Sequence, residues 1–401
     1  KIAEAMRNPK TTLNTDENKK KVKDALEWLH KNAYGKEPDK KVKELTENFK
    51  ITDSSKKKAL NWWDYEIGTP RALTNTLILL NGDISSDEKK KYTAPIKTFA
   101  PDSDKILSSV GKPEQAKGGN LVDISKVKLL ESIIEEDKDM MKNSIDSFNK
   151  VFTYVQDSAT DKERNGFYKD GSYIDHKDVP YTGAYGVVLL EGISQMKSLL
   201  RLSDAMDEST KAKYKQIVKT SVKSDSSYKQ NDYLSSYSDI SKMKSLIEDS
   251  TISTNGLTQQ LKIYNDMDRV TYHNKELDFA FGLSMTSKNV ARYESINGEN
   301  LKGWHTGAGM SYLYNSDVKH YRDNFWATAD MTRLPGTTTL NDMPSTNTKN
   351  DNSFVGGTKF DEQHASIGMD FENQDKTLTA KKSYFILNDK IVFLGTGIKS
   401  T

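Results

Sequence analysis

The spacing of apolar residues changes once along the chain, and this change restricts the fold more than any other feature. Up to about residue 250, apolar side chains recur every three or four positions, as on one face of a helix. Between Leu129 and Val155 they predict one amphipathic helix or two in succession. The positions are Leu130, Ile133, Ile134, Met141, Ile145, Phe148, Phe152 and Val155. VKDALEWLHKNA (22–33), ALTNTLILL from Ala72 and VVLLEGISQM from Val187 repeat the pattern, so the first part is expected to be all-α.

After about Gly256 polar residues alternate with β-branched and aromatic ones, as in VTYHNKELDFAFGLSM, MSYLYN and YFILNDKIVFLG. Alternation with a period of two is typical of strands with one buried face. Asn388-Asp389 separates two apolar runs and predicts a hairpin turn. The sequence therefore predicts an α+β multidomain protein, with a helical domain at 1–255 and a partial antiparallel sheet domain at 256–401.

Composition excludes several classes of protein. None of the 401 residues is cysteine, which removes disulfides, thiolate metal sites and cysteine nucleophiles. A net charge of +2 predicts no nucleic-acid partner, and no apolar run is long enough to cross a membrane. The first residue is Lys1 and no leader follows it, so the sequence is expected to be cytosolic or to have lost a signal peptide.

Residues 165–186, NGFYKDGSYIDHKDVPYTGAYG, hold one histidine among several tyrosines and glycines. His176 and a tyrosine such as Tyr185 can both donate and accept protons, and a loop can orient them. This segment is therefore a candidate for proton transfer. The alternative is that His176 only forms hydrogen bonds within the loop while the tyrosines pack.

Two further segments are candidates. In KGGNLVDISK (117–126), Gly118 and Gly119 allow a sharp turn that presents the amide of Asn120, with Asp123 or Ser125 capping the helix that follows; alternatively Asn120 merely belongs to the turn. In NWWDYEIGTPR (61–71), adjacent tryptophans point in different directions and seldom share one core. Such rings suit stacking on sugars, although burial between helices is the alternative.

The remaining histidines are scattered, without an HExxH motif or clustered carboxylates, and no phosphate-binding glycine loop is present. We therefore expect neither a metal site nor a cofactor.

Five blocks, in order, resemble the polysaccharide lyases of the hyaluronate lyase and chondroitin AC lyase group. They are NWWDYEIGTPRA, GGNLVDISKVK, GFYKDGSYIDH with YTGAYG, ESINGENLKGWHTGAGMSYLYN, and RLPGTTT. The resemblance is strongest to bacterial hyaluronate lyases. It implies an α/α toroid of paired helices, here an incomplete helical barrel, followed by antiparallel β-sheet domains.

The resemblance also implies an activity, β-elimination at a uronate of hyaluronan, and residue roles. Asn120 would neutralise the uronate carboxylate, His176 would remove the C5 proton, and Tyr185 would protonate the leaving oxygen. Alternatively, Tyr185 serves both as base and acid while His176 orients the substrate.

Other matched positions concern substrate binding. Asn61, Trp62 and Trp63 match an aromatic patch that positions the polymer, and Glu294 and Asn297 match residues that reach the cleft from the sheet domain. For the latter pair, a turn at Asn297-Gly298 is the alternative.

The chain departs from the pattern where an arginine-bearing segment is expected between Met196 and Lys197, and it ends before the sheet region of relatives does. The resemblance thus implies a secreted, monomeric bacterial lyase without cofactor. The alternatives are a chondroitin or xanthan lyase, or a catalytically impaired glycan-binding form.

Overall fold

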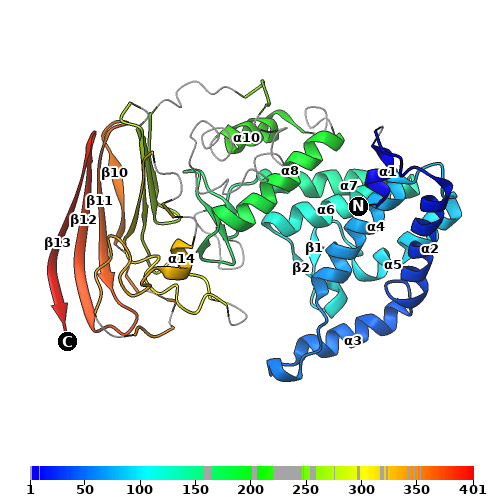
Figure 1. Cartoon of the computed structure of the whole chain (residues 1–401), viewed down its shortest axis with the longest axis horizontal. Helices are drawn as coiled ribbons and strands as arrows, with labels where there is room; N and C mark the ends of the chain where they lie inside the picture. The colour runs from blue at the N-terminus through cyan, green and yellow to red at the C-terminus, as the bar shows by residue number, and fades with distance from the viewer. Residues whose placement is uncertain are drawn as a thin grey trace. The chain divides into compact units, whose positions relative to one another are not determined.

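The computed structural model describes residues 2–8, 10–156, 164–200, 206–219, 246, 248–252, 259–274, 276–295, 299–316, 320–321, 324–340, 343–346, 348–349, 351–352 and 354–401. They form two compact units (Figure 1). One comprises Lys1–Val151 with Gln195–Asp207, and the other Phe152–Ser194 with Glu208–Thr401. The predicted domain boundary at 255/256 lies outside the described residues and stays a prediction.

The first unit is helical. Its α-helices are α1 (Ile2–Arg7), α2 (Asp16–Asn32), α3 (Pro38–Lys50), α4 (Thr69–Leu79), α5 (Ser86–Phe99), α6 (Gly118–Glu135) and α7 (Lys138–Asn149). Shorter elements are the 3₁₀ turns η1 (Ser54–Lys56), η3 (Ser108–Val110) and η4 (Lys150–Phe152), the π-helical turn η2 (Asp64–Gly68), and the strands β1 (Lys105–Ile106) and β2 (Glu114–Gln115). Across the described ranges, no helix has both the length and the apolar composition of a membrane span.

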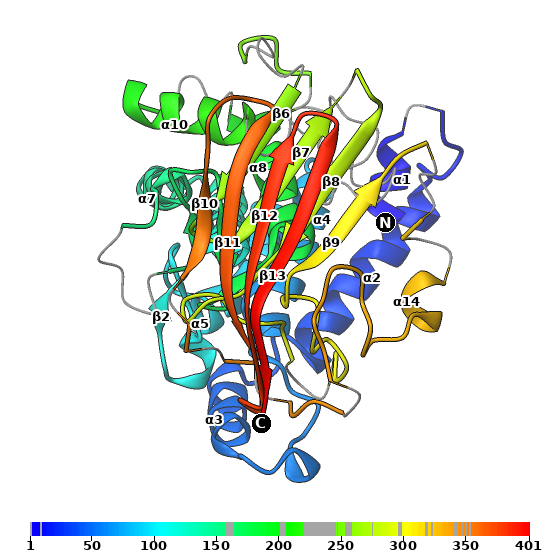
Figure 2. The same cartoon turned by 90° about the vertical axis from the view of Figure 1, so that its left-hand side faces the viewer.

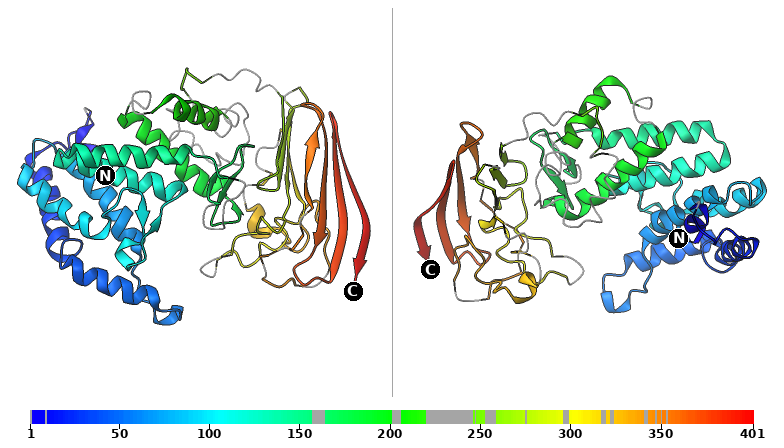
Figure 3. Two further views of the ribbon diagram at one scale, coloured as in Figure 1. Left: turned by 180° about the vertical axis from the view of Figure 1, so that it is seen from behind. Right: turned by 45° about the horizontal axis from the view of Figure 1, so that its top comes forward.

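Local sequence explains where several of these helices begin and end. At the start of α5, Ser85 accepts the backbone N–H of Glu88, whose carboxylate accepts the N–H of Ser85, forming a capping box. The predicted helical region after Leu129 is two helices in succession, because α6 ends at Glu135 and the next residue, Glu136, is left-handed with φ of 59°. Asp137 then caps α7 by accepting the N–H of Met140. Helices α6 and α7 lie side by side (Figure 3).

The second unit contains a small sheet followed by helices. Strands β3 (Gly166–Phe167), β4 (Tyr173–Asp175) and β5 (Val179–Pro180) pair antiparallel in that order. The π-helical turn η6 (Thr182–Gly186) leads into α8 (Val187–Leu200), whose residues from Gln195 onward are assigned to the first unit. Helix α10 (Glu208–Val218) belongs to the second unit. The segment predicted to be a glycine-rich loop is therefore a sheet followed by a π-turn. The prediction missed the sheet because strands of two or three residues are too short to show alternation.

Two four-stranded antiparallel sheets also belong to the second unit. The first has the order β6-β7-β8-β9 and the second β10-β11-β12-β13 (Figure 2). Their strands are β6 (Gln259–Tyr264), β7 (Arg269–Asn274), β8 (Phe279–Ser284), β9 (Met310–Tyr314), β10 (Val355–Lys359), β11 (His364–Glu372), β12 (Leu378–Leu387) and β13 (Lys390–Ser400). One short helix, α14, covers Phe325–Thr328.

The two large sheets share one apolar core. Buried side chains of β7 and β8, such as Val270 and Phe281, belong to the same cluster as Ile367 of β11 and Ile386 of β12. The predicted hairpin is confirmed, because Leu387 pairs with Lys390 across a turn in which Asn388 has a φ of 56°. Asparagine tolerates this left-handed conformation better than most residues do.

Candidate active site

His176 lies in the turn between β4 and β5, in a backbone conformation that the neighbouring Asp175 stabilises. The φ angles of His176 and Lys177 are 48° and 78°, a region that costs most side chains free energy. The Asp175 carboxylate accepts the N–H of His176 at 2.8 Å and the phenol of Tyr173 at 2.6 Å. The amide of Asn165 donates to the same carboxylate at 3.2 Å and accepts the N–H of Lys177 at 2.8 Å. These bonds fix the direction in which His176 leaves the sheet.

The π-turn η6 brings Tyr185 against His176. The two ring centres are 4.6 Å apart with planes at 72°, an edge-to-face contact. Tyr181 completes a triangle of rings, with its centre 5.5 Å from His176 and 4.8 Å from Tyr185. Single π-helical turns occur frequently at functional sites, because they re-aim a side chain within a helix.

Glu294 reaches the same three rings from the segment between β8 and β9. The Tyr181 phenol donates a hydrogen bond to the Glu294 carboxylate. The Nδ1 atom of His176 lies 3.9 Å from Glu294 Oε1 and 3.7 Å from Asp175 Oδ1. Both distances exceed a hydrogen bond, and a Coulomb attraction acts across them only when the imidazole carries a proton on both nitrogens. We call His176, Tyr181, Tyr185, Glu294 and Asp175 the histidine cluster.

The Glu294 segment is tied to the His176 turn by contacts outside the cluster. The N–H of Ala291 donates to the carbonyl of Asp178 at 2.8 Å, and Lys349 forms an ion pair with the Asp178 carboxylate. Arg292 is buried and donates from Nε to the carbonyl of Lys349 at 3.0 Å. The turn that follows His176 is thereby held against the segment that carries Glu294, although the two are far apart in sequence.

Burial and nearby charge alter the acidity of the cluster. The pKa of Asp175 is raised, chiefly by burial, against the opposing effect of its hydrogen bonds. Burial, then the negative charges of Asp175 and Glu294, raise the pKa of Tyr185 above its ordinary value. The pKa of Tyr181 is raised by burial and by its hydrogen bond to Glu294. Both phenols are therefore protonated at neutral pH, the form that a proton donor needs.

Asn120 lies in the first unit, in the first turn of α6, where it is half-buried. The helix starts at Gly118, with φ of 52°, so Asn120 is within the helix and not on a turn before it. The predicted cap by Asp123 or Ser125 is wrong. Asp123 forms an ion pair with Arg71 at 3.0 Å, and the Ser125 hydroxyl donates to the carbonyl of Leu121 at 2.6 Å. A glycine pair is typical of a turn, but it also permits a helix to start from a left-handed residue such as Gly118.

The paired tryptophans also belong to the first unit, at the entrance to π-turn η2. Trp62 and Trp63 are each partly exposed, and Asn61 accepts the N–H of Trp63 at 3.1 Å. The Trp63 ring packs on Gly68, where a Cβ atom would lie 2.6 Å from Trp63 Cζ3. Both candidate segments, one in each unit, thus contain a π-turn immediately before a helix.

The structure brings together His176, Tyr185 and Glu294 from the sequence-based candidates. Asn297 lies outside the described residues. Sequence reasoning assigned no role to Tyr181 or Asp175, although the YTGAYG block and the Asp-His pair contain them. Within the described ranges, no group of three or more histidine, aspartate or glutamate residues is arranged to hold a metal ion.

Two family models match the chain. Residues 1–230 match the N-terminal alpha-helical domain of polysaccharide lyase family 8, and residues 259–401 match the super-sandwich domain of the same family. These matches confirm the predicted order of a helical domain followed by an antiparallel sheet sandwich.

Relatives of known activity agree with the models. A hyaluronate lyase of Staphylococcus aureus (strain NCTC 8325 / PS 47) is 75% identical over 464 aligned residues, covering 100% of this chain and 57% of the relative. Among solved structures, Paenibacillus xanthan lyase has a TM-score of 0.77 at 28% identity, covering 100% of this chain and 41% of that one. Streptomyces coelicolor A3 chondroitin AC lyase, in complex with chondroitin sulphate, shows the same fold with a TM-score of 0.77 at 23% identity and coverage of 100% and 60%. The chain therefore belongs to polysaccharide lyase family 8.

Proposed function

We propose that this chain carries the catalytic residues of a glycosaminoglycan lyase that cleaves hyaluronan by β-elimination. The chain spans 57% of the length of the Staphylococcus relative, so the activity of the whole protein is part of this proposal. The observation that carries it is the edge-to-face contact of His176 and Tyr185, at 4.6 Å, beside two carboxylates. A base and an acid side by side suit a reaction that removes one proton and delivers another to a leaving oxygen.

The chemical obstacle in this reaction is the weak acidity of the C5 carbon next to a carboxylate. Removing its proton adds negative charge beside an existing negative charge. The half-buried side-chain amide of Asn120 is proposed to donate a hydrogen bond to that carboxylate and to stabilise the enolate-like intermediate. One such donor is typically worth about 3 kcal/mol in other oxyanion sites.

The electrostatics favour His176 as the base and Tyr185 as the acid. Asp175 and Glu294 lie within 4 Å of His176 Nδ1, so their charges stabilise the imidazolium that forms when His176 takes a proton. The raised pKa of Tyr185 opposes its ionisation, and therefore opposes the alternative in which Tyr185 is also the base. Asn61, Trp62, Trp63, Glu294 and Asn297 are proposed to bind and position the polymer.

The choice of hyaluronan rests on the 75% identity with a hyaluronate lyase, whereas the xanthan lyase and chondroitin AC lyase are 28% and 23% identical. Hyaluronan is too large a polymer to cross a membrane, so the proposed lyase acts outside the cell. We also propose that it acts as a monomer.

A glycan-binding form without catalysis is the second candidate, favoured by one observation. The alignment with the Staphylococcus relative spans 464 positions although this chain has 401 residues, so the relative carries residues without a counterpart here. If those residues supply cationic contacts to the polymer, binding and turnover would both be weakened.

One assay separates the two candidates. Incubation with hyaluronan should raise the ultraviolet absorbance that an unsaturated uronate product produces, whereas a binding protein leaves it unchanged. Tyr185→Phe should lower the rate about 10²- to 10⁴-fold, the usual contribution of general acid–base catalysis, without weakening binding. Tyr154→Phe is the matched control, because Tyr154 is another partly buried tyrosine of the same unit. Equal rates for both variants would refute the assignment of Tyr185.

The role of Asn120 needs a separate variant. Asn120→Ala should lower turnover about 10²- to 10³-fold, because it removes a donor to the developing negative charge. Asn143→Ala, on the exposed surface of α7, should leave turnover unchanged. A loss equal in both variants would point to damage to the helices and not to lost catalysis.

A further inference from the structure

Lys382 occupies an unusual place in the second unit. Along β12, the inward-facing positions are otherwise apolar or aromatic: Leu378, Ala380, Tyr384 and Ile386. Lys382 stands in the middle of this row and is 7% exposed. Lysine is almost never buried to this degree unless it is paired with an acid. Its neighbour Lys381 points to the opposite, exposed face, as the alternation of a strand requires.

The Lys382 ammonium is bound by carbonyls and not by a carboxylate. It donates to the carbonyls of Ala308 at 3.2 Å and Gly336 at 2.6 Å. No ion pair with an acid is found for it among the described residues. Burial alone lowers its pKa to about 8, so the group remains mostly protonated at neutral pH. An ammonium has three donors, and the two carbonyls leave its positive charge uncompensated.

Tyr384 presents a second unsatisfied polar group beside the ammonium. Its side chain is 1% exposed, and its phenol has no hydrogen-bond partner in the described part of the chain. A Cβ atom on Gly309 would lie 2.3 Å from the phenol oxygen and 2.9 Å from Lys382 Nζ, so both polar ends converge on that glycine. A buried phenol without a partner is costly, and usually indicates a missing ligand or water.

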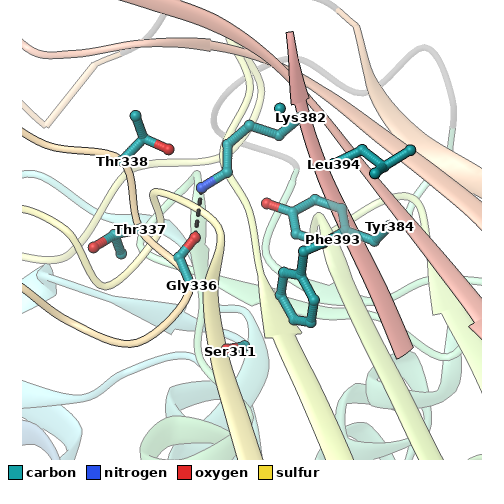
Figure 4. A pocket seen from close by; sticks show the side chains of 9 residues that line it. Ser311, Gly336, Thr337, Thr338, Lys382, Tyr384, Phe393 and Leu394 are labelled. Atoms are coloured by element: carbon teal, nitrogen blue, oxygen red, sulfur yellow. Dashed lines mark hydrogen bonds between the residues drawn. The ribbon is translucent and has the colours of Figure 1, made fainter. Parts of the chain in front are cut away.

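Lys382 and Tyr384 both line a hollow of about 450 Å³ (Figure 4). Its wall includes Ser311 and Thr338 on one side and Phe393 and Leu394 on the other. Gly395, which pairs with Lys382 across β12 and β13, also lines the hollow. We call this feature the lysine hollow.

We propose that the lysine hollow binds the acidic group of a small anionic sugar. The ammonium of Lys382 and the phenol of Tyr384 donate to the oxyanion, the hydroxyls of Ser311 and Thr338 bind the sugar hydroxyls, and Phe393 offers an apolar face to the ring. The volume is within the range of small-ligand sites. This site does not depend on the proposed lyase activity, because none of its residues belongs to the histidine cluster or to the first unit.

The competing explanation gives Lys382 only a structural role, which is to tie the carbonyls of Ala308 and Gly336 to the sheet. That explanation predicts no affinity for an anion, and it does not explain why the buried Tyr384 phenol has no hydrogen-bond partner in the described part of the chain. Ligand-detected NMR titration of the full chain with glucuronate, at neutral pH and low salt, distinguishes the two.

We expect Lys382→Met to weaken glucuronate binding about 10- to 100-fold, as for the loss of a charged hydrogen bond, and Tyr384→Phe to weaken it about two- to tenfold. Lys381→Met, on the exposed face of the same strand, should bind as the wild type does. Neutral N-acetylglucosamine should bind much more weakly than glucuronate, because it lacks the oxyanion. Acetate should also bind more weakly, because it lacks the ring.

Several results would overturn the proposal. They are undiminished binding in the Lys382→Met and Tyr384→Phe variants, or acetate or N-acetylglucosamine binding as tightly as glucuronate. If Lys382→Met fails to fold, Tyr384→Phe decides, since it removes one oxygen and keeps the packed ring. Hyaluronan turnover by the Lys382 and Tyr384 variants should equal that of the wild type. If the wild type does not cleave hyaluronan, the glucuronate-binding test of the lysine hollow can still be carried out.

Discussion

The histidine cluster and the lysine hollow both place a nitrogen base beside tyrosines in the second unit, but they differ in their carboxylates. In the histidine cluster, Asp175 and Glu294 lie within 4 Å of His176 Nδ1. In the lysine hollow, the Lys382 ammonium donates to two carbonyl oxygens and lies 5.7 Å from the centre of the Phe371 ring, with no carboxylate paired to it among the described residues. A carboxylate next to a base stabilises the protonated form inside the protein, which suits proton transfer. A cation without a carboxylate keeps its charge available to a ligand.

The largest expected difference concerns turnover. His176→Ala should lower the rate of hyaluronan cleavage about 10²- to 10⁴-fold, since the general base is lost. Lys382→Met should not change that rate. The measurement is the initial rate of product absorbance for both variants at the same substrate concentration. A rate loss in Lys382→Met as large as in His176→Ala would show that the two features are not functionally separate.

The second difference concerns stability and pH. The pKa of Lys382 is about 8 in the folded chain, against about 10.4 for an ordinary lysine. Between these values the unfolded state binds more protons than the folded state, so stability rises with pH through this window. Relative to Lys382→Met, the wild type should gain about 2 to 3 kcal/mol from pH 8 to pH 10.5.

Urea unfolding of both proteins at a series of pH values measures this gain, with Lys381→Met as the control for general alkaline effects. Parallel curves for the wild type and Lys382→Met would mean that the ammonium is not destabilised by burial, and the contrast between the two regions would weaken.

The smallest effect tests the carboxylate itself. Glu294→Gln keeps the shape and a hydrogen-bonding group for Tyr181 but removes one charge near His176. Turnover should fall about tenfold, because the imidazolium loses part of its electrostatic stabilisation. Glu299→Gln, exposed in the same segment, should leave turnover unchanged. A variant with a raised KM and an unchanged kcat would assign Glu294 to substrate binding only.

Several sequence-based predictions depended on spacing alone, and these are the ones that the structure reproduces best. The three- and four-residue period in the first part corresponds to α2, α4, α6, α7 and α8, and the two-residue alternation corresponds to β7, β8, β9, β12 and β13. Periodicity is reliable where an element buries one face, as α7, β7 and β12 do, because the buried face must repeat with the geometry of the element. The hairpin at Asn388 succeeded for a similar local reason.

Predictions failed where the local sequence is compatible with more than one backbone conformation. Gly118 and Gly119 fit a turn or the start of a helix, and packing around buried α6 selected the helix. Residues 166–180 are three strands of two or three residues, too short for any period to appear. The π-turns at Asp64–Gly68 and Thr182–Gly186 have no sequence signature of their own, since a single extra residue in a helical turn does not alter composition.

The sequence by itself determined the helical and strand regions of the chain and the hairpin turn between β12 and β13. It also determined the absence of cysteine chemistry and the blocks that resemble the lyases. All of these depend on residue type and spacing. The tertiary structure alone placed Glu294 beside His176, gave Tyr181 a carboxylate partner, and buried Lys382 without one. These contacts join residues distant in sequence, and such contacts are decided by how strands and loops pack and not by any local preference.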